Sequence, residues 1–363
     1  MKSTSKLHEL GQSLWLDNIT REMLDDGTLQ NYRDKLSVTG LTSNPTIFDL
    51  AIRHTKAYDD AIVRKFKKGQ PRETLFFELA LDDLRRAAAL FAPIHEKTGG
   101  MDGWVSLEVS PLLAHDTEGT VTEAKRLRDL AQCPNMFIKI PGTAAGVHAI
   151  EESIFAGVPV NVTLLFSRDQ YVAAANAYWR GIARRIEAGL NPKVHSVASI
   201  FISRWDKAVV GKVPPELANR LGIAVAQRTY KTYLERFAMP EWLKLHNAGA
   251  VPQRLLWAST GVKDPALSES YYIEALAAPN TINTIPEKTL LAFNERGALH
   301  GAMREDAGDA EAVLAEFAKI GIDTTELAAQ LQSEGAEAFS KSWADLMAAI
   351  ADKSDPSYKS AKP

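Results

Sequence analysis

The sequence predicts an α/β protein folded as a (β/α)8 TIM barrel. Eight short apolar segments recur along its 363 residues, and segments with helical periodicity fill most of the gaps between them. Strands that alternate with helices are typical of parallel βαβ units, and eight such units suggest a closed barrel. The structural alternative, an open doubly wound sheet, usually has a Gly-rich turn after its first strand. Here Asp17-Asn18-Ile19-Thr20 follows instead, which favours the barrel.

Each expected strand is a short run of apolar or alternating residues, and each expected helix has apolar positions at helical spacing. The strands are Ser13–Asn18, Val38–Ser43, Trp104–Ser110, Met136–Ile140, Pro159–Thr163, Val194–Phe201, Arg254–Thr260 and Thr281–Thr284. The clearest helices are Thr74–Lys97, Glu118–Ala131, Ala145–Ala156, Arg168–Ala188 and Pro215–Phe237. In a barrel, the active site is expected at the carboxyl ends of the strands.

Two segments add helices to a plain barrel. Residues 44–103 have a helical pattern between the second and third strands. Residues 286–353 are rich in Ala, Glu and Leu, with helical periodicity and a break at 321–324, so we expect C-terminal helices packed on the barrel. Residues 354–363 are polar with two prolines and are expected to be loose. The whole chain, 1–363, is interpreted as one barrel domain.

Composition restricts the class of protein. With 45% hydrophobic and 24% charged residues, the chain suits a globular fold with a large core. A net charge of −3 gives no reason to expect nucleic-acid or membrane partners. The single cysteine, Cys133, excludes an internal disulfide, and the eight histidines include no pair at metal-binding spacing. Residues 1–11 are polar with both signs of charge and do not resemble a signal peptide, so the expected location is the cytoplasm.

Lys139 is the most informative residue. It lies in the middle of a short apolar strand, and strand alternation places it on one face with Phe137 and Pro141. A lysine is rarely buried unless its amine is used. Burial disfavours the charged form and leaves a nucleophile suited to forming a Schiff base with a carbonyl. The alternative is an exposed lysine that protects an edge strand, but its neighbours on that face are apolar.

Other expected strands place polar residues on the same interior face. Alternation directs Glu108 inward while Val105, Leu107 and Val109 face the helices. By the same reasoning Asp17, Asn161 and Thr163 face inward, and Asn44 lies in a polar cluster at the end of the second strand. Asp17 alone could equally be a helix cap. Two carboxylates beside an amine, however, can divide the acid and base steps of aldol chemistry.

Six segments together resemble the transaldolase family, in its longer bacterial subtype, over essentially the whole chain. They are Leu14–Asp17, Gly40–Thr46, Val105–Ser110, Phe137–Thr143, Asn161–Ser167 and Ala198–Arg204. The resemblance implies that Lys139 is the Schiff-base nucleophile and that Asp17 accepts the proton of a substrate hydroxyl. It further implies that Glu108 works through a water held by Thr163. Asn44 and Asn161 would bind substrate hydroxyls, and Ser199 and Arg204 would bind phosphate.

One departure from the family concerns the phosphate site after the seventh strand. Better-known members have an arginine there, whereas this chain has Lys263 within Trp257–Pro265. Lysine offers a point charge in place of the two-pronged contact that arginine makes with phosphate. Lys263 is therefore expected to replace that arginine, with an ordinary solvated loop lysine as the alternative.

The leading interpretation is a transaldolase that moves a dihydroxyacetone unit between sugar phosphates without a cofactor or metal. An aldolase that releases free dihydroxyacetone is the nearest rival, and the resemblance associates the Glu108–Thr163 pair with transaldolase. A non-catalytic sugar-phosphate-binding barrel is a second rival. A transaldolase half of a larger fusion is a third alternative, and a homodimer is the candidate assembly.

Overall fold

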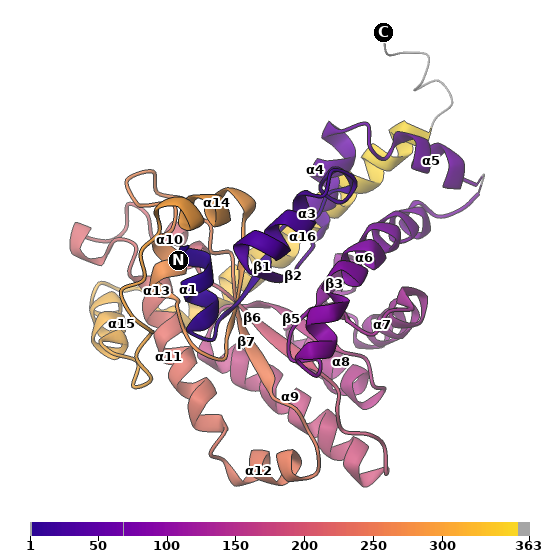
Figure 1. Cartoon of the computed structure of the whole chain (residues 1–363). Helices are drawn as coiled ribbons and strands as arrows, with labels where there is room; N and C mark the ends of the chain where they lie inside the picture. Colours follow the sequence, from indigo (N-terminus) through magenta and orange to yellow (C-terminus); the bar gives the residue numbers. More distant parts are fainter. Residues whose placement is uncertain (1, 68, 355–363) are drawn as a thin grey trace.

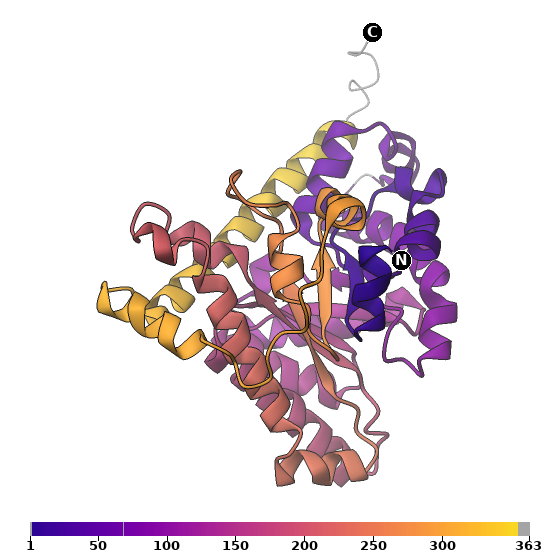
Figure 2. The same cartoon turned by 60° about the vertical axis from the view of Figure 1, so that its left-hand side comes forward.

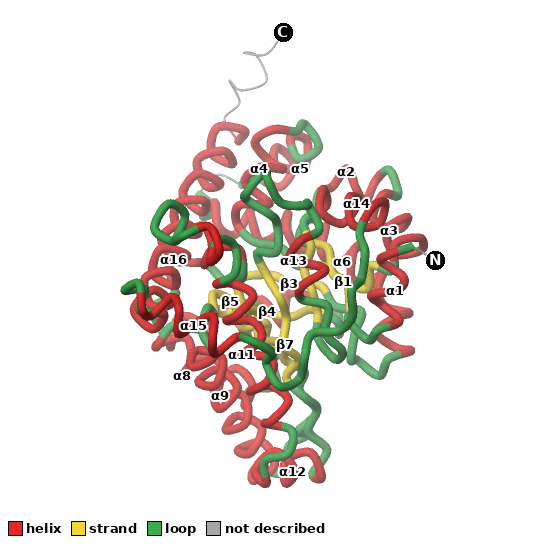
Figure 3. The backbone as a smooth tube through the Cα atoms, turned by 90° about the vertical axis from the view of Figure 1, so that its left-hand side faces the viewer, coloured by secondary structure: helices red, strands yellow, loops and turns green. Residues whose placement is uncertain are grey.

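The computed structural model describes residues 2–67 and 69–354 and confirms the predicted barrel (Figure 1). Eight strands form one sheet in the order β2-β1-β8-β7-β6-β5-β4-β3, and the paired neighbours all run parallel. Helices surround the strands, which lie at the centre of the molecule (Figure 3). The strands are β1 (Ser13–Leu16), β2 (Val38–Leu41), β3 (Val105–Glu108), β4 (Met136–Pro141), β5 (Val160–Leu165), β6 (Ser196–Phe201), β7 (Gln253–Ala258) and β8 (Ile282–Ile285).

The two ends of the sheet, β2 and β3, meet and close the barrel. The Leu41 N–H donates to the Trp104 carbonyl at 3.0 Å, and the Ser43 hydroxyl donates to the Ser106 carbonyl at 2.7 Å. Gly40 permits this approach, because a Cβ there would lie 2.5 Å from the Trp104 oxygen. A larger residue at this position would push β2 away from β3.

The predicted alternation of strand faces is confirmed. Leu14, Leu107 and Ile138 belong to the core layer shared with the surrounding helices. Trp15 and Phe137, on the opposite faces of their strands, belong to a second cluster, which also extends to α11 (Leu221–Arg236), α15 (Ala310–Lys319) and α16 (Thr324–Ser354). Phe137 stacks on Trp104 with ring centroids 4.0 Å apart. These aromatic rings form a packed floor beneath the carboxyl ends of the strands, so the barrel is filled and is not a pore.

The described chain contains sixteen α-helices and two short 3-10 helices. They are α1 (Ser3–Glu9), α2 (Arg21–Asp25), α3 (Thr28–Leu36), α4 (Pro45–His54), α5 (Asp59–Lys65), α6 (Arg72–Lys97), η1 (Pro111–Leu113), α7 (Thr117–Ala131), α8 (Ala144–Phe155), α9 (Arg168–Glu187), α10 (Ser203–Ala208), η2 (Pro215–Leu217), α11 (Leu221–Arg236), α12 (Pro240–Asn247), α13 (Tyr271–Ala275), α14 (Glu287–Arg296), α15 (Ala310–Lys319) and α16 (Thr324–Ser354). Four of the five clearest expected helices agree within two residues at each end.

The fifth expected helix, Pro215–Phe237, is wrong at its start. Only η2 forms at its beginning, Asn219 then adopts a left-handed φ of 60°, and α11 begins at Leu221. The buried carboxylate of Asp206 accepts hydrogen bonds from the N–H groups of Leu221 and Gly222. That contact satisfies the free donors of the first turn and fixes the start of the helix.

The long C-terminal helix α16 crosses the structure from α15 to α4 and α5 (Figure 2). The predicted break between α15 and α16 is confirmed, with Gly321 in the left-handed conformation at φ 83°. Of the segment expected to be loose, Ser354 is the last residue of α16, and residues 355–363 lie outside the described ranges. Across residues 2–67 and 69–354, we find no helix with the length and hydropathy of a membrane span.

A buried polar network lies at the amino end of the barrel. The Asp102 carboxylate accepts hydrogen bonds from the Ser13 hydroxyl, the Trp15 indole and the Gly103 N–H at 2.5, 2.8 and 2.9 Å. The Arg254 guanidinium then donates to the Ser13 hydroxyl at 2.9 Å. Both charged side chains are less than one-tenth exposed, so the network replaces the water that they lose.

We expect Asp102→Ala to lower the free energy of unfolding by about 3 kcal/mol, because three buried donors lose their acceptor. Chemical denaturation measures this loss, and Asp129→Ala, at an exposed carboxylate on α7, is the matched control. Turnover below the unfolding transition should stay near the wild-type rate. A normal denaturation midpoint for Asp102→Ala would show that the network adds nothing to stability.

Candidate active site

A cavity of about 110 Å³ opens at the carboxyl ends of the strands. It is lined by Asp17, Thr42, Asn44, Lys139, Thr163, Ser199, Phe201, Arg204, Ala258, Ser259, Thr284 and Phe339. Six of the nine site residues expected from the sequence are in this set. The other three, Glu108, Asn161 and Lys263, lie around the cavity without lining it.

Lys139 projects from the interior face of β4 and is 5% exposed. Its Nζ lies 2.9 Å from Glu108 Oε2 and donates to the Ser43 carbonyl at 2.9 Å. The strand register places Glu108 of β3 and Asn161 of β5 on either side of Lys139. The amine is therefore enclosed, faces a cavity and lies beside a carboxyl group with which it can exchange a proton.

Glu108 is buried behind this amine at 6% exposure. Burial raises the pKa of Glu108 above its ordinary value, and the positive charge of Lys139 opposes that rise without cancelling it. The Oε2 atom has no aligned hydrogen-bond partner in the described part of the chain despite its approach to Lys139. This carboxyl group can thus hold a proton at a higher pH than an exposed glutamate, as a general acid requires.

Asp17 follows the end of β1, which β2 separates from the Glu108 strand β3. Its carboxylate accepts a hydrogen bond from Thr42 at 3.0 Å, and the Thr42 and Thr284 hydroxyls lie 2.6 Å apart. Burial raises the pKa of Asp17, while the charges of Lys139 and Lys263 act in the opposite direction. The helix that follows is capped by Thr20, so the alternative role of Asp17 as its cap is excluded.

Thr163 and Asn161, two residues apart on β5, differ in their hydrogen bonding. The Thr163 hydroxyl is buried and has no partner within the described residues, which leaves it available to a water or a substrate. The Asn161 amide already donates to Ser106 at 3.1 Å and accepts from Ser199 at 2.8 Å. Asn161 therefore connects β3, β5 and β6 inside the barrel.

Arg204 lies in the first turn of α10 and faces the cavity. Its guanidinium lies 5.4 Å from the centre of the Phe201 ring, and burial lowers the pKa of the Arg204 side chain. Among the described residues, the guanidinium makes no hydrogen bond or salt bridge, and the carboxylate of Glu334 attracts it at longer range. Lys263 is exposed on the loop after β7. A partly buried, unpaired arginine at the mouth of a cavity is suited to binding an anionic group.

Comparison with known proteins identifies the family of the chain. Residues 14–350 match the family model described as "Transaldolase/Fructose-6-phosphate aldolase". The chain is 42% identical over 358 residues to "Transaldolase" of Thiobacillus denitrificans, covering 96% of this chain and 100% of the relative. It is 41% identical to a Neisseria meningitidis "Transaldolase" over 351 residues and 40% identical to one from Acidothermus cellulolyticus over 354 residues, with at least 95% of each chain covered. The chain belongs to the transaldolase family.

Sequence reasoning missed six of the residues that line the cavity of this transaldolase-family chain. Thr284 and Ala258 share the interior phase of Ile282 on β8 and Leu256 on β7, so strand alternation could have identified both. Ser259 is out of that phase and has a left-handed φ of 54°, which alternation does not predict. Thr42 lies within the segment Gly40–Thr46, which carries the family resemblance but assigns it no role. Phe201 and Phe339 are apolar and carried no chemical signal, and Phe339 comes from α16, far beyond the last strand in the sequence.

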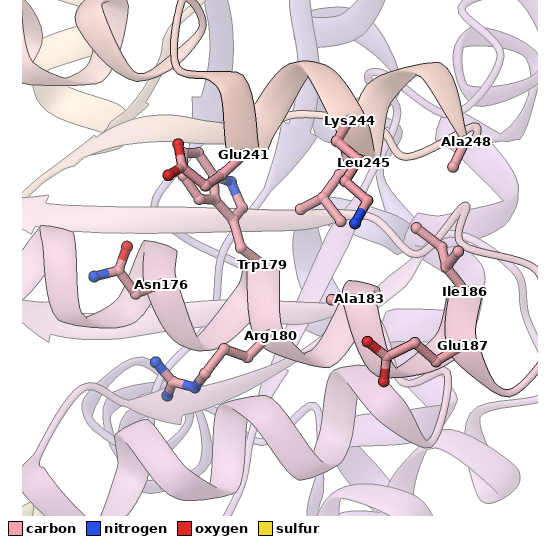
Figure 4. Close-up of a pocket in the computed structure, with 10 residues that line it drawn as sticks. All are labelled: Asn176, Trp179, Arg180, Ala183, Ile186, Glu187, Glu241, Lys244, Leu245 and Ala248. Carbon is pink, nitrogen blue, oxygen red and sulfur yellow. The ribbon is translucent and has the colours of Figure 1, made fainter.

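A larger groove of about 440 Å³ lies between α9 and α12 (Figure 4). Trp179, Ala183 and Leu245 line it, with charged residues such as Glu187 and Lys244 beside them. It lies near the amino ends of the strands, whereas TIM-barrel enzymes place their chemistry at the carboxyl ends. The described residues also contain no group of three or more His, Cys, Asp or Glu that could hold a metal ion.

The burial of Asp17 predicts a pH-dependent gain in stability for Asp17→Asn. A raised pKa means that the folded chain binds this proton more tightly than the unfolded chain, so wild type loses stability as pH rises above about 4. The asparagine side chain does not titrate in this range. The free energy of unfolding of Asp17→Asn minus that of wild type should therefore increase between pH 4 and pH 8.

Denaturation of both proteins across that pH range measures the effect, with Asp129→Asn as the exposed control. A difference that is constant with pH, or that favours wild type more at high pH, would contradict the inferred environment of Asp17.

Proposed function

We propose that this transaldolase transfers a dihydroxyacetone unit from a ketose phosphate to an aldose phosphate through a Schiff base on Lys139. The donors are sedoheptulose 7-phosphate and fructose 6-phosphate, and the acceptors are glyceraldehyde 3-phosphate and erythrose 4-phosphate. The observation that carries the proposal is the buried amine of Lys139, which faces the cavity and lies 2.9 Å from a buried carboxyl group. Family membership supports the same reaction.

The reaction begins when the neutral Lys139 amine attacks the ketose carbonyl and forms a carbinolamine. Glu108 donates the proton that lets the carbinolamine hydroxyl leave as water, and an iminium forms. Asp17 then takes the proton of the C4 hydroxyl. The C3–C4 bond breaks, its electron pair moves toward the iminium nitrogen, and an aldose leaves an enamine on Lys139. The enamine carbon attacks the acceptor aldehyde, the new alkoxide takes the proton back, and hydrolysis releases the ketose.

We assign Thr163 the role of binding the water that carries protons between Glu108 and the carbinolamine. Its hydroxyl lines the cavity and has no partner in the described chain, so a water there would satisfy an otherwise unpaired group. Glu108 does not line the cavity itself. A water between the two residues would bring its proton to the reacting carbon.

The remaining site residues are assigned to substrate binding. Asn44 lines the cavity while its side chain caps α4 through Ile47, and we assign it to substrate hydroxyls together with Asn161. Arg204, Ser199 and Lys263 are assigned to the phosphate. Remote binding of this kind positions the carbonyl near the nucleophile.

The rival activity, release of free dihydroxyacetone, differs in what happens to the enamine. The proposal requires consumption of fructose 6-phosphate to depend on erythrose 4-phosphate, with sedoheptulose 7-phosphate as the product. Chromatographic quantification of both ketose phosphates and of free dihydroxyacetone separates the two activities. Equal consumption without acceptor, with stoichiometric dihydroxyacetone, would assign the chain to the aldolase activity.

We further propose that the enzyme is cytoplasmic and needs no cofactor or metal, and that it forms a homodimer. We also propose that residues 1–363 form one domain. The cavity supports one domain, because Phe339 of the C-terminal helix α16 lines it together with residues of the barrel strands.

Glu108→Gln should reduce turnover by roughly 10² to 10⁴, the usual effect of losing a general acid–base group. Formation of the Schiff base should persist at a low level, because Lys139 remains. Steady-state kinetics and borohydride trapping measure the two effects separately. Glu118→Gln, at an exposed position on α7, is the control, and normal turnover of Glu108→Gln would remove Glu108 from the mechanism.

Arg204→Ala should raise KM for phosphorylated donors by on the order of tenfold or more, since a charge-assisted contact is lost. Lys263→Ala should act in the same direction but more weakly, because an ammonium holds phosphate without fixed geometry. The measurement is kcat/KM with matched phosphorylated and unphosphorylated donors, such as fructose 6-phosphate and fructose.

Arg64→Ala, at an exposed position on α5, controls for loss of positive charge. Equal losses on both donors in the Arg204 variant would show that Arg204 acts on the chemistry or the fold, and the phosphate assignment would fail.

A further inference from the structure

The end of β5 contains a strained residue directly beside the proposed water-binding threonine. Leu164 has a left-handed φ of 57°, and the pairing of β5 with β6 is irregular between Val162 and Leu165. A left-handed backbone costs a non-glycine residue about 1–3 kcal/mol and persists only when its surroundings enforce it. The structure around Leu164 must therefore supply that enforcement.

The strain changes the direction of the side chains after Thr163. Regular alternation would direct Leu164 toward the helices and Leu165 into the barrel. Instead, Leu164 joins the cluster that contains Phe137 and residues of α16, and Leu165 joins the outer core with Val162. The irregularity is thus a β-bulge, which re-aims side chains near active sites. It follows immediately on Thr163 and sets the end of the strand that presents the Thr163 hydroxyl.

Gln332 of α16 holds this bulge from above. Its side-chain amide donates to the carbonyls of Leu164 and Gly142, each at 2.9 Å. Gly142 directly follows β4, the strand that carries Lys139, and its N–H donates to the Thr163 carbonyl at 2.7 Å. One side chain therefore joins the ends of the strands that present the nucleophile and the proposed water ligand.

The same face of α16 is shaped to contact this region. Gln332, Gly335 and Phe339 are separated by three and four residues, which places them on one side of a helix. A Cβ at Gly335 would lie 2.8 Å from Leu164 Cδ2, so glycine lets α16 approach the bulge closely. Phe339 then reaches the cavity wall.

We infer that Gln332 is a positioning residue for catalysis, which holds the Leu164 bulge so that Thr163 and Lys139 keep their relative placement. Gln332 lies outside the cavity lining, so it acts through these two strand ends. The inference rests on the proposed role of Thr163 in proton transfer. Its consequence is that α16 contributes to the chemical step as well as to the cavity wall.

The test compares Gln332→Met with Gln330→Met. Methionine keeps the length and helix propensity of glutamine but removes the donors. Gln330 lies on the same helix, is exposed and donates a hydrogen bond to Glu334, away from the strand ends, so it controls for the substitution itself. Because small misplacements of reacting groups are costly, kcat of Gln332→Met should fall on the order of tenfold, with KM within about threefold of wild type.

A double-mutant cycle with Thr163→Val separates positioning from stability. If Gln332 acts through Thr163, the double variant Gln332→Met/Thr163→Val should be little slower than Thr163→Val alone. The inference would be overturned if the loss of kcat in the double variant equalled the product of the two single losses. It would also be overturned if Gln332→Met and Gln330→Met had the same kcat. A lowered melting temperature without a change in kcat would overturn it as well.

The cycle also distinguishes a failure of the role inferred for Gln332 from a failure of the role proposed for Thr163. A wild-type rate for Thr163→Val would remove the role of Thr163 and the inference with it. A slow Thr163→Val beside a fast Gln332→Met would remove only the inference. If Gln332→Met fails to fold, Gln332→Asn, whose amide is one methylene too short to reach both carbonyls, replaces it in the same cycle.

Discussion

The burial of the Lys139 amine beside the Glu108 carboxyl group is the constraint on which the site depends. Two ionisable groups at 5% and 6% exposure are costly to keep in a barrel unless each stabilises the other. The neighbouring strands are arranged around that pair: the register of β3, β4 and β5 places Glu108, Lys139 and Asn161 side by side. Below them, Phe137 and Trp104 form an apolar floor that excludes water from beneath the amine.

The barrel alone does not complete this environment. Phe339 of α16 supplies part of the cavity wall, and Gln332 of the same helix joins the ends of β4 and β5. At the opposite end of the barrel, Asp102 and Arg254 belong to a fully hydrogen-bonded network with Ser13. The charged groups of this network are paired within the protein, whereas the cavity at the carboxyl end contains the Thr163 hydroxyl, which is buried and has no partner among the described residues.

Much of this arrangement could be predicted from sequence because it follows strand periodicity. A lysine in phase with Phe137 and a glutamate out of phase with Val105 and Leu107 indicate the interior face from the sequence alone, and the two hydrophobic clusters confirm that assignment. What could not be predicted depends on contacts between distant segments. The start of α11 is set by Asp206, and the phase of β5 changes at Leu164 under α16. Asp206 lies outside the helical pattern of α11, and α16 lies outside the strand pattern of β5, so local periodicity does not reveal either contact.

The most direct test of the central claim is covalent trapping of the substrate on the protein. The wild-type protein is incubated with fructose 6-phosphate, reduced with borohydride and digested, and the modified peptide is located by mass spectrometry. The account predicts one reduced adduct, on Lys139, and none in Lys139→Ala, which should stay folded and inactive. An adduct on another lysine, or an active Lys139→Ala variant, would contradict it.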